Sequence, residues 1–308
     1  MSALPIIIDT DPGQDDAVAI LLALASPELD VRAITAVAGN VPLALTESNA
    51  RKMVELSGRT DVPVYAGAVR PMVRDLFTAE FVHGPTGLDG VDLPEPTVAV
   101  QPEHAVNYLI DALMGSEDGE ITLCVLGPLT NIGLALVMEP RIAPKVKQLA
   151  LMGGGSHGNV TPAAEFNIYV DPHAAEHVFR SGIPLVMAPL DVTHKARATS
   201  ERLAPFSKMG TASGDAVAGM LEFYRRYELH GAGGAPLHDP CVIAYLLAPH
   251  LFSGRSCRVD IVAHGPAVGA TLIDWQGVTG SEPNALVLDE VDADGFFALI
   301  AERMARLP

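Results

Sequence analysis

The chain has 308 residues, of which 49% are hydrophobic and 19% are charged, a balance typical of folded globular proteins. Its 20 Lys and Arg residues against 37 Asp and Glu residues give a formal net charge of −17. Because so acidic a surface repels phosphate groups, we expect neither nucleic acid nor an anionic membrane as a partner. Three cysteines without metal or disulfide spacing, and a first segment without a basic leader, predict a cytoplasmic protein.

Short apolar runs alternate with helical patterns along most of the chain. The apolar runs predict strands at residues 5–8, 31–38, 62–65, 121–126, 146–152 and 185–188. The helical patterns predict helices at residues 17–25, 42–56, 103–114, from 131 onward and after 172. Apolar strands that alternate with helices indicate a parallel sheet covered on both faces. We therefore predict an α/β fold with a mostly parallel, doubly wound sheet flanked by helices.

Two segments interrupt this alternation. Residues 74–96 are rich in Gly and Pro and predict a long loop or flap, while residues 195–236 carry a helical pattern that ends in glycines. Long excursions from an α/β scaffold often carry function. Residues 258–274 and 284–288 predict strands added to the same sheet. Since the chain shows no repeat and no linker, we predict a single domain over residues 1–308.

Carboxylates are concentrated directly after the first predicted strand. They are Asp9, Asp11, Asp15 and Asp16. Ligands bind at the carboxyl ends of strands in open α/β sheets, which is where these acids are expected to lie. Helix capping would account for Asp15 or Asp16 but not for the others. Several carboxylates in one place favour a bound cation, and an all-oxygen set without His or Cys favours Ca²⁺ or Mg²⁺.

Seven motifs, in order along nearly the whole chain, resemble those of the inosine–uridine-preferring nucleoside hydrolase family. They are DTDPGQDDA (9–17), AGN (38–40), HG with TGLDG (83–90), LGPLTN (126–131), LMGGG (151–155), AEFN with DP (164–172) and HDP (238–240). The resemblance implies hydrolysis of the N-glycosidic bond of ribonucleosides, of the uridine and inosine class, to ribose and a free base. It also implies a role in nucleoside salvage and a homo-oligomer, either a dimer or a tetramer.

The resemblance further implies a bound Ca²⁺ ion. Asp11, Asp16 and Asp239 would be side-chain ligands, and Thr130 would contribute its backbone carbonyl. Asp11 would also act as the general base for the attacking water. Such an ion can acidify a water and chelate the 2′- and 3′-hydroxyls of the ribose. Asp239 also fits the N-cap of a helix over residues 240–247, and this position is compatible with metal binding.

Other matched positions are polar, as a sugar ligand requires. By the same resemblance, Asp15 and Asn167 would hold the 2′- and 3′-hydroxyls, and Asn159 and Glu165 would surround the 5′-hydroxyl. Asn40 would orient the hydroxyls or the water. Each hydroxyl needs both a donor and an acceptor, which these side chains supply. Without the resemblance, Asn159 is more typical of a turn and Glu165 of a solvated charge.

Histidine and tyrosine side chains are the candidates for contact with the departing base. His238 precedes Asp239 and would protonate the base, since histidine can hold a proton near neutral pH. His83 is a second candidate. Tyr224 or Tyr227, on the helical excursion, would cover the base. These residues leave open whether purines or pyrimidines are preferred.

Two other functions compete with nucleoside hydrolysis. A Mg²⁺ phosphatase with an aspartyl nucleophile would use the DTD sequence at residues 9–11, but the acids that follow would repel a phosphate. A catalytically silent binding protein is the second alternative. Retention of the complete set of matched acids and asparagines argues against it, because a silent protein has no need of them.

Overall fold

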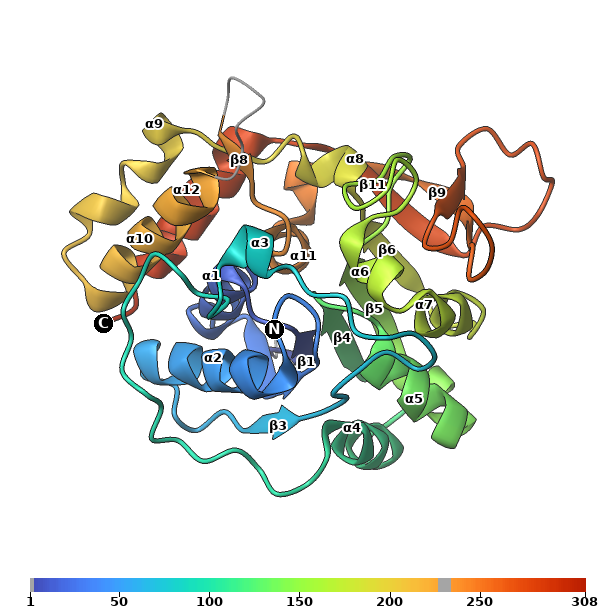
Figure 1. Cartoon of the computed structure of the whole chain (residues 1–308), viewed down its shortest axis with the longest axis horizontal. Coiled ribbons are helices and arrows are strands. Elements are labelled where there is room, and N and C mark those ends of the chain that lie inside the picture. Colours follow the sequence, from blue (N-terminus) through green and yellow to red (C-terminus); the bar gives the residue numbers. More distant parts are fainter. Residues whose placement is uncertain (1–2, 227–233) are drawn as a thin grey trace.

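The computed structural model describes residues 3–226 and 234–308 (Figure 1). The main sheet is built from β1 (Leu4–Thr10), β2 (Leu29–Ala36), β3 (Val64–Ala66), β4 (Ile121–Val125), β5 (Val146–Met152), β6 (Leu185–Ala188), β9 (Phe252–Ile261), β10 (Thr271–Asp274) and β11 (Ala285–Val291). Its strand order is β10-β9-β11-β6-β5-β4-β1-β2-β3. Each strand predicted from the sequence therefore appears in the sheet.

Most neighbouring strands of the sheet are parallel. The strands from β1 to β6, together with β11, form parallel pairs, whereas β9 pairs antiparallel with β11 and with β10. The predicted fold class is confirmed, including the strands added near the C-terminal end. The antiparallel edge arises because β9 and β10 are joined by a short connection, whereas parallel neighbours need a crossover.

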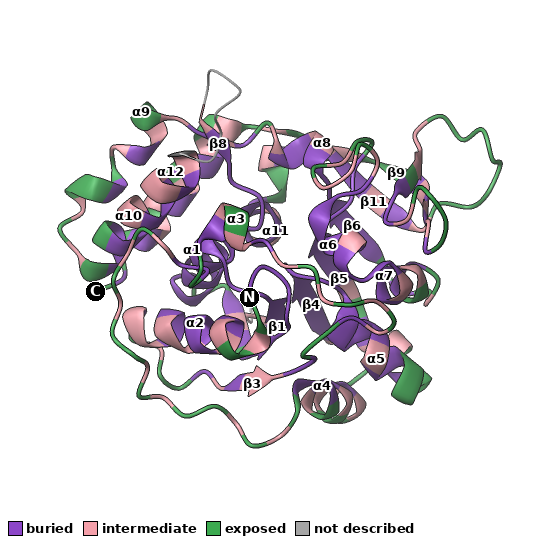
Figure 2. Ribbon diagram, viewed as in Figure 1, coloured by how far each residue is buried: buried purple, intermediate pink, exposed green. Residues whose placement is uncertain are grey.

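Helices cover both faces of the sheet. One layer contains α1 (Gln14–Leu24), α2 (Leu43–Leu56), α10 (Ala212–Arg226), α11 (Pro240–Leu247) and α12 (Ala293–Met304), and the other contains α4 (Ala105–Met114), α5 (Thr130–Met138) and α7 (Pro172–Phe179). Ile6 and Ile8 pack into the first layer and Ile7 into the second, as the alternation of side chains along a strand requires. Figure 2 shows the central strands buried between these layers.

The flap at residues 74–96 is an extended loop that contains one short helix, α3 (Glu80–His83). Two buried amides attach it to the body of the protein. Gln14 donates to the backbone carbonyls of His83 and Asp89, and Asn49 donates to those of Pro12 and Thr86. These bonds hold the flap beside the segment that follows β1.

The second excursion, residues 195–236, contains β7 (Arg197–Ala198), α9 (Ser200–Leu203), α10 and β8 (Ala235–Pro236). β7 and β8 pair antiparallel and form a small second sheet. The shorter helices are α6 (Phe166–Val170), α8 (Leu190–Thr193) and the 3-10 turns at Pro140–Lys145, Phe206–Lys208 and Pro249–Leu251. None of the helices described is both long and apolar enough to cross a membrane.

The strand order places a topological switch point between β1 and β4. From β1 the chain proceeds outward through β2 and β3 on one side, and β4, β5 and β6 continue on the other. Connections leave in opposite directions at such a point, so a crevice opens at the carboxyl ends of the two strands. The segment rich in carboxylates begins at the end of β1 and therefore lies at this crevice.

Candidate active site

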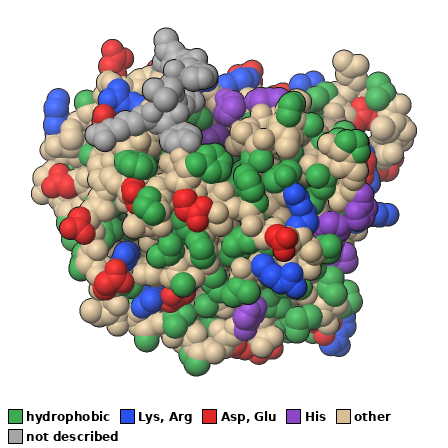
Figure 3. Space-filling view, viewed as in Figure 1, with side chains coloured by type: hydrophobic (Ala, Val, Ile, Leu, Met, Phe, Trp, Pro, Cys, Tyr) green, Lys and Arg blue, Asp and Glu red, His purple; other side chains and the backbone are tan. Residues whose placement is uncertain are grey.

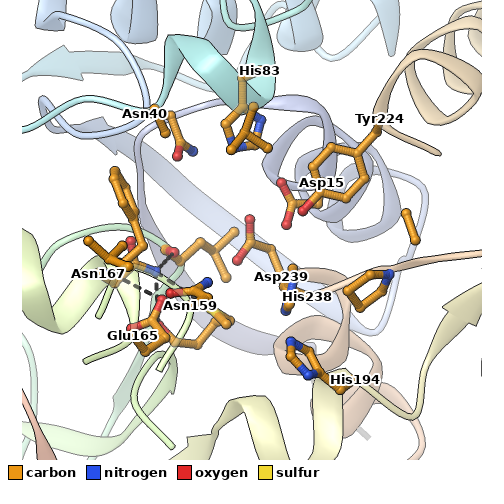
Figure 4. Close-up of a pocket in the computed structure, with 18 of the residues that line it drawn as sticks. Asp15, Asn40, His83, Asn159, Glu165, Asn167, His194, Tyr224, His238 and Asp239 are labelled. Carbon is orange, nitrogen blue, oxygen red and sulfur yellow. Dashed lines mark hydrogen bonds between the residues drawn. The ribbon is translucent and has the colours of Figure 1, made fainter. Parts of the chain in front are cut away.

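A cavity of about 350 Å³ lies at the carboxyl ends of β1, β4 and β5, a size typical of small-molecule sites. Most of the predicted site residues line it (Figure 4). These are Asp15, Asn40, His83, Asn159, Glu165, Asn167, His238 and Asp239. Segments from six regions of the chain thus meet at one place.

Three buried acids at the base of the cavity form a candidate metal cluster. Oxygen atoms of Asp15, Asp16 and Asp239 all lie within 4.8 Å of one another. Asp239 occupies the N-cap position of α11, but its side chain makes no capping hydrogen bond. Asp16 does cap α1, since its Oδ2 accepts from the Gly13 backbone at 2.9 Å. Asp16 therefore combines capping with cluster membership, whereas Asp239 leaves its carboxylate free of a capping bond.

Asp11 lies next to this cluster, and its carboxylate packs against Gly39 and Gly127. Its Oδ2 accepts a hydrogen bond of 2.7 Å from the Asn40 backbone N–H, and its Oδ1 has no hydrogen-bond partner among the described residues. A Cβ atom at Gly39 or Gly127 would collide with the carboxylate. This close approach explains the glycines of the AGN and LGPLTN motifs.

The pKa of each of the four acids Asp11, Asp15, Asp16 and Asp239 is raised. Burial is the largest cause for each of them: it raises the pKa of Asp15 to about 7 and those of Asp11 and Asp239 well above the usual range. Repulsion from Asp16 adds to all three shifts. No ion pair in the described part of the chain involves these acids. The missing positive charge and the free Asp11 Oδ1 fit a hard cation bound by oxygen ligands.

Two residues near the cluster have contacts of other kinds. Asp9 accepts hydrogen bonds from Thr35 at 2.6 Å and Asn131 at 2.8 Å, so its carboxylate connects β1 to β2 and α5. Thr130 is the first residue of α5, and its hydroxyl donates to Asp171 at 2.8 Å. Leu126, earlier in the same motif, is the residue that lines the cavity. The carbonyl ligand role of Thr130 stays a prediction.

Two asparagines direct their carbonyl oxygens toward the cavity. The Asn40 amide nitrogen donates to the backbone carbonyl of Asp11 and to Asp16 Oδ2, both at 3.1 Å. That of Asn167 donates to the carbonyls of Leu126 at 2.7 Å and Met152 at 3.2 Å. Because these donors are already used, each side chain has its Oδ1 left to accept a hydrogen bond from a ligand hydroxyl.

Glu165 is 2% exposed, which contradicts the alternative of a solvated charge. It caps α6, with Oε1 accepting from the Asn167 backbone and Oε2 from the Gly154 and Ile168 backbones. Burial nevertheless raises its pKa to about 7. Asn159 is exposed at the mouth of the cavity, in a turn closed by a hydrogen bond from its N–H to the Ala164 carbonyl.

The opposite end of the cavity is lined by aromatic and imidazole rings. His83 stacks on Tyr224 with ring centroids 5.6 Å apart, and His238 contacts the Thr193 hydroxyl at 2.7 Å through Nδ1. Burial lowers the pKa of both histidines to about 3. Tyr224 was an open candidate from the sequence and lines the cavity. Tyr227 lies outside the described residues.

Sequence reasoning missed several residues of the cavity wall. The ring centroids of His194 and His238 are 5.6 Å apart. On its other side, His194 Nδ1 lies 3.4 Å from His157 Nε2. The available signal was its position shortly after β6, at the same edge of the sheet. Phe81 and Phe166 provide apolar surface, and Phe166 belongs to the AEFN motif. On the face in Figure 3, acidic side chains are scattered among basic ones and form no single patch.

A doubly wound α/β scaffold with a cavity at its switch point is typical of enzymes that bind a small ligand, and the buried acids at the base of this cavity could hold a metal ion. The chain matches the inosine-uridine preferring nucleoside hydrolase family over residues 6–298 and belongs to that family. The resemblance in the sequence motifs is thereby confirmed, and the chain is an enzyme of the nucleoside N-glycosidase class.

Curated and solved relatives cover almost the whole chain. It is 50% identical over 307 residues to the pyrimidine-specific ribonucleoside hydrolase RihA of Escherichia coli O7:K1, covering 98% of each chain. The purine-preferring ribonucleoside hydrolase of Gardnerella vaginalis superposes with a TM-score of 0.90, at 32% identity and 98% coverage of both chains. The plant nucleoside hydrolase PpNRh1 superposes with a TM-score of 0.89, at 34% identity, with 98% of this chain and 99% of that one covered.

Proposed function

We propose that this chain is a Ca²⁺-dependent ribonucleoside hydrolase of the uridine and inosine class, with pyrimidine ribonucleosides as its preferred substrates. The observation that carries the proposal is the buried carboxylate cluster, which opens into a cavity where the amide oxygens of Asn40 and Asn167 are left to accept hydrogen bonds. The preference for pyrimidines rests on the similarity to RihA.

Asp11, Asp16 and Asp239 would hold the cation through their carboxylates, and Thr130 would add its backbone carbonyl. Asp15 lies in the same cluster of acids. Bound there, Ca²⁺ would neutralise their charge and polarise both the ribose hydroxyls and the attacking water. The oxygen-only donor set and the absence of Lys and Arg from the described cavity wall support this assignment.

The side chains around the cluster would bind and orient the ribose. Asp15 and the Oδ1 atoms of Asn40 and Asn167 would accept hydrogen bonds from the 2′- and 3′-hydroxyls. Asn159 and Glu165, further along the cavity, would contact the 5′-hydroxyl. Such contacts hold the glycosidic bond at a fixed position relative to the attacking water.

Proton transfer would use groups at both ends of the cavity. Asp11 Oδ1, which has no partner among the described residues, is the atom we assign to accept the proton of the attacking water. His238, once protonated, would donate that proton to the departing base at the other end and return to its neutral form. A base that leaves as a neutral molecule leaves more readily than an anion.

A phosphatase function is not supported by the cavity. Its described wall carries three acids, Asp15, Glu165 and Asp239, but no Lys or Arg that would pair with a phosphate. A phosphate dianion would therefore meet uncompensated negative charge.

The experiment that tests the proposed function measures ribose release. Purified protein with Ca²⁺ is expected to release reducing sugar from uridine and cytidine, and more slowly from inosine and adenosine. Release from purine ribonucleosides at an equal or higher kcat/KM would contradict the preference. Absence of release from all four would contradict the function and support a silent binding protein.

His238→Ala is expected to slow the hydrolysis of uridine by a factor of about 10²–10⁴, the usual contribution of a general acid. A riboside with an activated aryl leaving group needs no proton, so its hydrolysis should change little. Comparing kcat for the two substrates measures the difference. Equal losses for both would mean that His238 has no role in leaving-group activation.

The proposal extends to the organisation of the protein. We propose a single domain over residues 1–308, because Ile6 and Met304 share one hydrophobic core. The homo-oligomer implied by the family resemblance, a dimer or tetramer, and the cytoplasmic role in nucleoside salvage are proposed on that resemblance alone. Size-exclusion chromatography with light scattering determines the oligomeric state.

A further inference from the structure

Gln14 makes three hydrogen bonds through its side chain, although it belongs to the carboxylate motif and has no predicted role. It is fully buried at the first position of α1. Its Nε2 donates to the backbone carbonyls of His83 at 2.9 Å and Asp89 at 3.0 Å. Its Oε1 lies 2.6 Å from Nδ1 of the His83 ring. Both ends of the amide are therefore engaged with the flap.

These contacts determine which nitrogen of His83 carries the proton. Carbonyl oxygens only accept hydrogen bonds, so the Gln14 NH₂ group must face the two backbone carbonyls, and Oε1 must face His83. Because Oε1 is also only an acceptor, the hydrogen bond requires a proton on His83 Nδ1. In a neutral imidazole, Nε2 then carries a lone pair and accepts hydrogen bonds. Burial favours the neutral ring, since it lowers the pKa of His83 to about 3.

The position of the ring makes Nε2 the atom available to a ligand. The edge with Nδ1 and Cε1 lies against Gly13, where a Cβ would collide with both atoms, and against Gln14. Tyr224 stacks on one face of the ring. His83 nevertheless lines the cavity, and Nε2 has no hydrogen-bond partner among the described residues, which leaves it as the ring nitrogen open to a ligand.

His238, also at this end, has no comparable constraint among the described residues. His238 Nδ1 contacts the hydroxyl of Thr193, and a hydroxyl can either donate or accept a hydrogen bond. His238 can therefore adopt either neutral form, and it retains the ability to present a proton at Nε2. The two histidines thus differ in the hydrogen bonds that they can offer to a base.

We propose that Gln14 is a positioning residue that holds His83 with its proton on Nδ1, so that Nε2 accepts a hydrogen bond from an N–H group of the base. The inference rests on the proposed function, since it assigns this end of the cavity to the base. It selects bases that present a donor, such as N3–H of uracil, N1–H of hypoxanthine or the exocyclic amine of cytosine. His83 then recognises the base, and proton donation belongs to His238.

Nuclear magnetic resonance of the protein without substrate tests the first step. With ¹⁵N-labelled histidine, long-range ¹H–¹⁵N spectra distinguish a protonated ring nitrogen from an unprotonated one, and His83→Phe identifies the His83 signals by their loss. We expect a protonated Nδ1 and an unprotonated Nε2. A proton on Nε2, or a doubly protonated ring at neutral pH, would overturn the inference whether or not the protein hydrolyses nucleosides.

Kinetics with 3-methyluridine tests the second step, because the N3-methyl group removes the donor. We expect the unaltered enzyme to prefer uridine by about tenfold or more in kcat/KM, the effect of one hydrogen bond. His83→Phe keeps a ring at this position but removes the acceptor, so the preference that remains in this variant measures the bulk of the methyl group alone. An equal preference in both enzymes would overturn the base selection.

Gln14→Met tests the positioning role, and Gln148→Met is its matched control on β5, outside the cavity. In Gln14→Met we expect the Nε2-protonated form of His83 to appear in the spectra and the preference for uridine over 3-methyluridine to fall. The control should change neither. If Gln14→Met fails to fold, the spectra of the unaltered protein and of His83→Phe still determine which nitrogen of His83 carries the proton. Release of ribose from no nucleoside would overturn the proposed function and the base selection, while the spectra would still report the tautomer.

Discussion

Asp11→Ala is expected to lower kcat/KM for uridine by a factor of at least about 10²–10⁴, since it removes the proposed general base and one carboxylate of the cation site. The physical reason is the free Oδ1 of Asp11 beside the cluster, which no other described side chain replaces. Asp11→Asn is the sharper variant, because it keeps the shape and can keep the hydrogen bond from the Asn40 N–H while losing the charge. Ribose release measured with excess Ca²⁺ checks both.

The melting temperature distinguishes a loss of activity caused by unfolding from the loss expected here. Asp11 is buried among like charges, which raise its pKa, so removing it should leave the melting temperature of the calcium-free protein unchanged or higher. Asp118→Asn, at an exposed carboxylate paired with Lys145, is the control and should alter neither property. Near-normal turnover in Asp11→Asn would show that the carboxylate motif has been misinterpreted.

Chelation of Ca²⁺ is expected to abolish ribose release and to lower the melting temperature, and added Ca²⁺ should restore both. At about 100 times its Kd, a ligand that binds only the folded state stabilises it by about 2.7 kcal/mol. Activity that survives exhaustive chelation would contradict the assignment of the cation site. Addition of Mg²⁺ in place of Ca²⁺ tests which hard cation the oxygen ligands select.

The stabilisation by calcium should grow as the pH rises. Burial raises the pKa of Asp15 from 3.8 to about 7, so between these values the folded protein without metal binds protons that the unfolded chain has lost. Its free energy of unfolding therefore falls as the pH rises through this window. Ca²⁺ competes with these protons and gains affinity over the same range. Melting temperatures with and without Ca²⁺ at pH 5 and pH 7.5 measure the effect, and a difference that shrinks at the higher pH would contradict it.

The sequence was sufficient for the fold class and for the principal acids. Buried parallel strands need apolar residues on both faces, so runs such as residues 146–152 were recognisable without any tertiary information. The acids after β1 were equally recognisable. Several carboxylates that follow a buried strand repel one another unless a cation neutralises them, so their close spacing indicated a site. The assignment of the sugar-binding residues depended instead on the family resemblance, since Asn159 or Glu165 taken alone fits a turn or a surface.

Tertiary structure decided which side chains meet and which atoms of each are free. Gln14 and His83 are 69 residues apart, so no local pattern could show that the amide of one is bonded to the ring of the other. In the same way, Asp9 is bound to Thr35 and Asn131 from two other elements, and its location outside the cluster follows only from those contacts. Local periodicity determines which residues are buried, whereas hydrogen-bond partners depend on distances between remote segments. The sequence by itself therefore determined the scaffold and the charge of the site, and only the folded chain decided how its donors and acceptors are shared.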